Sequence, residues 1–287
     1  TTEIYTLSLH DALPIFGVFM RHPRAEIVTL PQNGPMDEFV RKRARNDYPL
    51  AALWRLGVRN ARVPLDDLMD PYSRARMADL VAIGFRFTVS GFGIPMGAAR
   101  EVVVAHASLI DRFECVLPFD AIAPATDEMA AFRKAFGKPV MLARVATSAD
   151  DAKVGSKIEL FVSHGFRPDQ MDQIESLIDV ADGFVIRAGL GTDLPTLAAE
   201  LDAWSARTGK MLDLHLRIAA NNPAANIKDD GAILAAAAEL HACALAFPRI
   251  AMFLDPFMDL DRGYFVRNGL VDRRCNLRTS GLAVEAL

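Results

Sequence analysis

The sequence predicts a single domain with the (β/α)8 barrel fold, and three observations lead to this prediction. Eight short apolar runs alternate with amphipathic segments, which is the order expected of parallel βαβ units. Eight such units close a barrel, for which about 250 residues are typical. No repeat, low-complexity tract or linker divides the 287-residue chain. The alternative is an open doubly wound sheet, which the lack of a glycine-rich turn after the first strand disfavours.

Each predicted strand is a short run rich in apolar residues. In chain order these runs are Glu26–Leu30, Ala61–Leu65, Phe85–Ser90, Phe113–Pro118, Val140–Val145, Gly183–Ala188, Met211–Ile218 and Ile250–Asp255. A further run, Ile158–Val162, follows the fifth strand and is interpreted as an excursion over the mouth of the barrel. The alternative is that this run is a true strand and Glu26–Leu30 is not.

The predicted helices repeat apolar residues at helical spacing. They span Asp70–Ile83, Ala98–Ile110, Asp127–Phe136, Asp169–Val180, Leu194–Thr208 and Gly231–Ala246. Asp70 followed by Pro71 is a typical helix start, whereas Gly84, Gly137 and Gly209 stand where helices should end. The basic run Arg41–Arg45 is interpreted as the solvated face of a helix.

Composition excludes several classes of protein. With 51% hydrophobic and 24% charged residues and a net charge of −4, the chain is typical of a globular protein and not of a strongly basic nucleic-acid binder. No apolar run approaches the roughly 18 residues of a membrane helix, because Glu239 and His241 interrupt the richest one, Ile233–Phe247. Three scattered cysteines without CxxC spacing indicate a reducing cytoplasm. We therefore expect neither nucleic acid nor a membrane as a partner.

The first fifteen residues, Thr1–Ile15, resemble the conceptual translation of a common sequencing-library adapter. We expect residues 1–15 to be such an artefact, which removes His10 and Asp11 from functional consideration. The native barrel would then span residues 16–287 of an N-terminally truncated chain, and the part lost upstream could be a signal peptide or a whole domain.

Alternation along the strands places polar side chains inside the predicted barrel. In the seventh strand Asp213, His215 and Arg217 share one face, opposite a row of leucines. The same alternation predicts that Arg62, Thr88, Ser90, Arg144, Arg187 and Asp255 lie inside or at the rim. Buried charge must be paired or used, so two interpretations stand. Either these residues form a structural ion network, or they bind a ligand at the carboxyl end of the strands.

Under the second interpretation each residue has a role. Arginine binds carboxylates, phosphates and sugar hydroxyls, and we expect the substrate-binding residues to be Arg144, Arg187, His215, Arg217 and Asp66. Paired carboxylates can run acid–base chemistry, and the candidates are Asp120 and Asp255. Loops after the strands add weaker candidates: Asp67, His164, Asn221, Asn222 and Asp259.

Other motifs are absent or weak. The turns Gly91–Gly93 and Gly189–Thr192 are rich in glycine but carry neither a P-loop lysine nor a dinucleotide fingerprint. No HExxH motif or close Asp/His cluster indicates a metal site, and Ser163-His164 has no nucleophile elbow. We therefore expect no cofactor and no metal.

Two stretches carry a family resemblance. Leu56–Arg59 before the second strand, and the tail Asp259–Arg274, resemble the corresponding regions of glycoside-hydrolase-like barrels of the large clan-A type. Those enzymes carry a glutamate at the end of strand four and another on strand seven. Here these regions read Leu117–Asp120 and His215–Ala219, so neither glutamate is present, and Asp120 alone stands where the first would be. The resemblance implies the fold and not the catalytic pair.

A second resemblance concerns Asn33–Asp37 and Arg43–Leu50, which are similar to regions that follow a calcineurin-like metallophosphoesterase domain in bacterial proteins. None of that family's metal motifs occurs in this chain.

The sequence thus predicts a cytoplasmic, glycosidase-like barrel that binds a sugar or a small anionic ligand at its carboxyl-end mouth; if it is an enzyme, we expect a hydrolase. The alternative is a non-catalytic accessory barrel of a larger protein, for example one following a calcineurin-like metallophosphoesterase domain. An isomerase or aldolase-type barrel is a third interpretation, disfavoured because the last four predicted strands carry no lysine apart from Lys210, which stands at the start of one of them.

Overall fold

The computed structural model describes residues 14–20, 27–29, 43–45, 47–145, 164–218, 229–259 and 268–286. Among them, eight parallel strands close a barrel in the order β1-β10-β9-β8-β7-β6-β5-β4, with β4 pairing back to β1. The strands are β1 (Ile15–Phe19), β4 (Asn60–Pro64), β5 (Arg86–Phe92), β6 (Arg112–Leu117), β7 (Val140–Arg144), β8 (Gly183–Gly189), β9 (Met211–Arg217) and β10 (Ile250–Asp255). The predicted fold class is confirmed.

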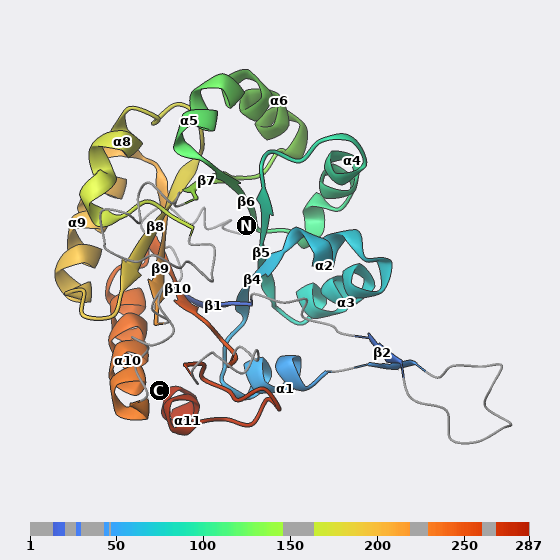
Figure 1. Cartoon of the computed structure of the whole chain (residues 1–287), viewed down its shortest axis with the longest axis vertical. Coiled ribbons are helices and arrows are strands. Elements are labelled where there is room, and N and C mark those ends of the chain that lie inside the picture. The colour runs from blue at the N-terminus through green and yellow to red at the C-terminus, as the bar shows by residue number, and fades with distance from the viewer. Residues whose placement is uncertain are drawn as a thin grey trace, which may run out of the picture.

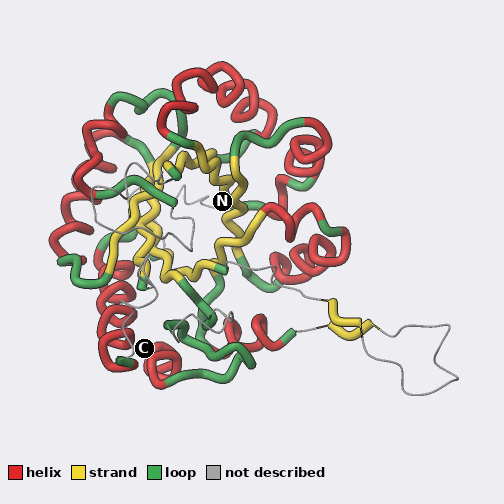
Figure 2. Tube along the Cα trace, in the orientation of Figure 1, coloured by secondary structure: helices red, strands yellow, loops and turns green. Residues whose placement is uncertain are grey.

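Helices surround the ring of strands, as Figures 1 and 2 show. They are α1 (Tyr48–Arg55), α2 (Leu65–Met69), α3 (Pro71–Ala82), α4 (Gly97–Ala105), α5 (Phe119–Ile122), α6 (Thr126–Phe136), α8 (Met171–Glu175), α9 (Leu194–Thr208), α10 (Asp230–Ala246) and α11 (Thr279–Ala286), with 3-10 turns at Ala107–Leu109, Ala123–Ala125 and Pro168–Gln170. Asp70 caps α3 by accepting a hydrogen bond from the Ser73 amide at 2.7 Å. Gly137 and Gly209 end α6 and α9 with φ of 69°.

The first predicted strand is wrong. Residues Ile27–Thr29 form β2, which pairs antiparallel with β3 (Arg43–Arg45) in a two-stranded sheet that projects from the barrel (Figure 1). The same pairing shows that the end of the basic run is a strand and not a helix. The barrel instead begins with β1, whose Gly17 interrupts the apolar run Phe16–Phe19. A Cβ on Gly17 would lie 2.6 Å from the Phe253 ring, so the wall of the barrel requires glycine there.

Several sequence-based predictions fall outside the described residues. They concern the apolar run Ile158–Val162, the loop candidates Asn221 and Asn222, the segment 260–267 of the tail, and His10 and Asp11. Ile15, the last residue of the predicted artefact, is the first residue of β1 and is paired with Ala251.

The main apolar core lies between the barrel and its helices. Phe113 of β6 packs edge-on against Phe132 of α6, and Phe184 of β8 against Trp204 of α9. Inside the barrel, Val116, Met141, Ala143 and Val185 form a smaller apolar cluster. Much of the remaining inner surface is polar, and its buried residues include Arg62, Glu114 and Asp213.

Candidate functional site

Two buried ion pairs cross the inside of the barrel. Arg62 of β4 donates from Nε and Nη2 to the two carboxylate oxygens of Glu114 on β6, the Nη2–Oε1 distance being 2.6 Å. Arg112 of β6 donates from Nη1 to Oδ1 of Asp213 on β9 at 2.5 Å. All four side chains are buried. Because water cannot screen these charges, Arg62 depends on Glu114 for neutralisation, whereas Arg112 is neutralised by Asp213 together with Asp111, whose Oδ2 lies 3.2 Å from Nη2 of Arg112.

The surroundings of Asp213 shift its pKa. Burial raises the pKa of Asp213 to about 6, because loss of hydration disfavours the carboxylate more than Arg112 favours it. Glu114 adds a further negative charge that raises this pKa. The contact between Asp213 and Arg112 is part of the predicted ion network, although Arg112 is not one of the arginines named from the sequence. Glu114 was missed as well, and the alternation Arg112-Phe113-Glu114 was the signal that could have revealed both.

His164 reaches the mouth of the barrel through a short segment that enters between two strands. The ladder between β7 and β8 is limited to the pairs Met141–Gly183 and Leu142–Phe184. Beyond these pairs, the Gly165 amide donates to the Arg144 carbonyl at 2.8 Å, and the Arg187 amide donates to the Phe166 carbonyl at 2.7 Å. The segment thus bridges the ends of β7 and β8 and fixes the backbone of His164.

Glycine is required next to this histidine. Gly165 has a φ of 102°, a conformation that L side chains rarely adopt, and a Cβ there would lie 3.0 Å from Cβ of Arg187. The histidine's position therefore depends on a residue without a side chain.

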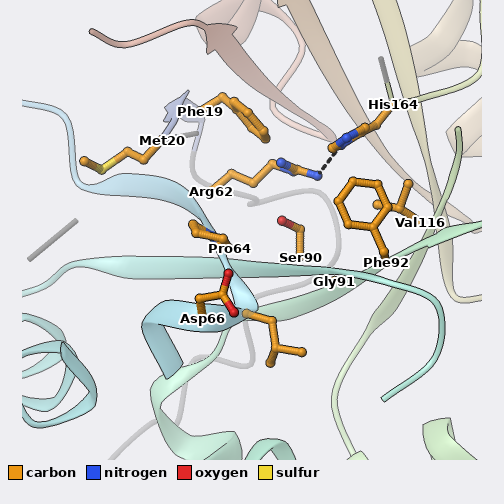
Figure 3. A pocket seen from close by; sticks show the side chains of 11 residues that line it. Phe19, Met20, Arg62, Pro64, Asp66, Ser90, Gly91, Phe92, Val116 and His164 are labelled. Carbon is orange, nitrogen blue, oxygen red and sulfur yellow. Dashed lines mark hydrogen bonds between the residues drawn. The ribbon is translucent and has the colours of Figure 1, made fainter. Parts of the chain in front are cut away.

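A cavity of about 230 Å³ opens at the carboxyl ends of β1, β4 and β5. Its lining residues are Phe19, Met20, Arg62, Pro64, Leu65, Asp66, Ser90, Gly91, Phe92, Val116 and His164 (Figure 3). Nη2 of Arg62 lies 3.1 Å from Nδ1 of His164, as the dashed line in Figure 3 marks. The Phe19 ring covers the guanidinium of Arg62 at 4.0 Å, and the His164 and Phe92 rings meet edge-on at 5.2 Å. The cavity therefore combines aromatic walls with hydrogen-bonding groups.

The seven predicted site residues separate into three groups. Asp66, on α2, lines the cavity. A second group, Arg187, His215, Arg217 and Asp255, is brought together on the inner face of β8, β9 and β10, where the register pairs Arg187 with His215 and Arg217 with Asp255. His215, Arg217 and Asp255 are buried, and Arg187 is half-buried. None of this second group is among the residues that line the described cavity.

The third group, Arg144 and Asp120, lies outside the inner surface. Arg144 was predicted to share the inner face, but Met141 and Ala143 occupy that face of β7, so Arg144 has the opposite parity. Its guanidinium donates to Gln173 of α8 at 2.8 Å and lies 5.2 Å from the Phe119 ring, on the helix side of the barrel. Asp120 is exposed on α5, after the end of β6.

A second cavity, of about 390 Å³, lies at the amino end of the barrel between α1, α10 and α11. Arg55 and Glu285 form a bidentate ion pair at its edge, with distances of 2.6 and 2.9 Å. His241 packs edge-on against Phe16 in its wall. Ligand sites of (β/α)8 barrels lie at the carboxyl end, so the first cavity is the candidate site.

Within the described ranges, no group of three or more His, Cys, Asp or Glu side chains is placed to hold a metal ion. None of the described helices has the length and apolar character needed to cross a membrane.

Comparison with solved structures finds similarities of the backbone, and one of the matching structures is a glycoside hydrolase. A family 5 xyloglucanase from Paenibacillus pabuli, solved in complex with ligand, superposes with a TM-score of 0.49 at 9% sequence identity, covering 95% of this chain and 97% of that chain. No protein-family model and no curated protein sequence matches the chain. The barrel assignment rests on the closed strand order and not on this superposition.

Proposed function

We propose that the cavity at the carboxyl end of the barrel binds a single unit of a neutral sugar. The observation that carries this proposal is the lining itself, in which the aromatic rings of Phe19 and Phe92 stand beside Asp66, Ser90 and His164. Sugars present apolar C–H faces together with hydroxyl groups that both donate and accept hydrogen bonds. Small-ligand sites typically have this mixture of apolar walls and a few polar groups.

Charge favours a neutral ligand over an anionic one. Arg62 is the arginine among the described residues that line the cavity, and its Nε and Nη2 groups both donate to the carboxylate of Glu114. Asp66 adds a carboxylate to the same lining. A carboxylate or phosphate ligand would therefore meet a guanidinium that is already neutralised and a second negative charge, which disfavours its binding.

Size limits the ligand as well. Sites for drug-sized ligands range from about 300 to 1,000 Å³, so a cavity of about 230 Å³ suits one sugar ring better than an oligosaccharide.

The positions of the carboxylates favour sugar binding without hydrolysis. Glycoside hydrolysis generally uses two carboxyl groups about 5 to 10 Å apart across the scissile bond. Both Asp66 and Asp120 are exposed, but Asp66 is the one carboxylate among the described lining residues and Asp120, on α5, lies outside the lining. This distribution favours the accessory, non-catalytic barrel over the glycosidase.

Calorimetric titration tests the proposal with neutral methyl glycosides of glucose, galactose, mannose and xylose, and with glucuronate and glucose 6-phosphate as anionic counterparts. We expect a neutral glycoside to bind and its anionic counterpart to bind at least tenfold more weakly. Asp66→Asn should lower the affinity about tenfold or more, since hydrogen bonds to charged groups contribute about 1.5–3 kcal/mol. The matched control is Asp120→Asn, an exposed carboxylate outside the cavity lining, which should leave the affinity within twofold.

Three results would overturn the proposal. They are binding of the anionic ligands alone, an unchanged affinity in Asp66→Asn, and hydrolysis of nitrophenyl glycosides that Asp120→Asn abolishes. The last result would show that the chain is a glycosidase with Asp120 in its machinery.

A further inference from the structure

The hydrogen bond between Arg62 and His164 fixes where the imidazole carries its hydrogen. A guanidinium has N–H donors and no acceptor, so Nδ1 of His164, 3.1 Å from Nη2 of Arg62, must be the acceptor. A neutral imidazole that accepts at Nδ1 carries its hydrogen on Nε2. His164 is therefore a hydrogen-bond donor at Nε2.

Arg62 cannot turn away from this contact without loss. Its Nε and Nη2 both donate to Glu114, and this pair is almost completely buried. The Phe19 ring lies over the guanidinium at 4.0 Å, an arrangement that stabilises the cation. Because the position of Arg62 is determined by these contacts, the Glu114–Arg62–His164 chain holds one tautomer of the histidine.

The ring itself is also held in place. His164 meets Phe92 edge-on at an interplanar angle of 85° and Phe19 at 79°, and its backbone forms a bridge with Val145. Packing on two sides and a backbone bridge restrict rotation of the ring, so the donor is positioned before a ligand arrives.

We propose that His164 is a specificity-determining residue of this cavity, held by the Glu114–Arg62 pair as the Nε2–H tautomer so that Nε2 donates to a ligand oxygen. This inference rests on the proposed sugar-binding function. Asp66 supplies a hydrogen-bond acceptor in the same cavity. The lining therefore offers sugar hydroxyls both a donor, the imidazole N–H of His164, and an acceptor, the carboxylate of Asp66. A ligand group that has only donors, such as an ammonium, has no partner in His164.

The first part of the test does not involve a ligand. Long-range proton–nitrogen correlation spectra of histidine-labelled protein distinguish the two neutral tautomers, and the signal of His164 is assigned by its loss in His164→Gln. We expect the Nε2–H tautomer at neutral pH. An Nδ1–H tautomer would overturn the inference.

The second part of the test compares two substitutions, each of which replaces one of the two ring nitrogens of His164 with an amide. Glutamine places its amide near the position of Nε2, whereas asparagine places its amide near that of Nδ1. His164→Gln should therefore retain sugar affinity within about threefold, measured with the methyl glycoside that binds the wild type, while His164→Asn should lose at least tenfold. Thermal unfolding of both variants should be similar.

The outcomes separate this inference from the proposed function. Equal sugar affinity in the two variants would overturn the donor role while the sugar site stands. No binding of any glycoside by the wild type, with the expected tautomer present, would overturn the proposed function and the donor role that depends on it.

Discussion

Glu114→Gln is the substitution that most strongly tests the buried charge arrangement. Glutamine has nearly the same shape but no charge, so the guanidinium of Arg62, which is 1% exposed, would remain in the barrel without the carboxylate that neutralises it. Breaking a buried ion pair by removing one partner typically costs about 3–5 kcal/mol. Since domains have free energies of unfolding of about 5–15 kcal/mol, we expect a large part of the stability to be lost.

The assay is urea unfolding followed by circular dichroism. With a slope of about 1–3 kcal/mol per molar urea, the loss should lower the midpoint by at least about 1 M. The double variant Arg62→Met/Glu114→Met should recover most of the loss, because no charge is then buried. Glu285→Gln is the matched control: its bidentate pair with Arg55 is exposed to solvent and should contribute less than about 1 kcal/mol. A cost below about 1 kcal/mol for Glu114→Gln, or a double variant no more stable than the single one, would refute this reasoning.

Two further predictions concern pH and backbone conformation. The pKa of Asp213, about 6 in the folded state, exceeds its unfolded value, so the folded state binds the extra proton between about pH 4 and 6. The stabilisation from this proton, about 3 kcal/mol, is complete below pH 4 and is lost as pH rises through 6. Asp213→Asn should remove that part of the pH dependence of unfolding, and a stability difference from wild type that stays constant from pH 4 to 7 would contradict the assignment. Gly165→Ala should cost about 1–3 kcal/mol in urea unfolding and weaken glycoside binding, because Ala is strained at a φ of 102°. Gly189→Ala, at a position with open space, is its control, and equal costs for the two would argue against a special role for Gly165.

Seven of the eight barrel strands could be predicted from the sequence, because each is a short apolar run between helical segments. The first could not, since Gly17 breaks the apolar run of β1 and glycine normally weakens a strand prediction. Its presence is explained by tertiary contacts, because a Cβ there would meet the Phe253 ring of β10 and the Asn60 carbonyl of β4.

The sequence predicts which side chains of the candidate site face the inside of the barrel, but not which residues they pair with. Alternation correctly places Arg62, Arg187 and Arg217 on the inner face. It fails for Arg144, because Met141 and Ala143 occupy the inner positions of β7 and Arg144 has the opposite parity. The pairing of Arg62 with Glu114 depends on two strands that are not adjacent in the barrel, so no local pattern contains it. The position of His164 depends on the limited ladder between β7 and β8, a tertiary feature that residue spacing does not encode.

Mapping of the bound sugar on the amide spectrum of the protein tests the central claim most directly. During titration with the methyl glycoside, we expect the largest shifts at Gly91, Phe92 and His164 around the carboxyl-end cavity. The amides of Gly57 and Arg59, at the larger cavity on the amino end, should stay unchanged. Shifts concentrated at Gly57 and Arg59, or no shifts at saturating sugar, would contradict the account.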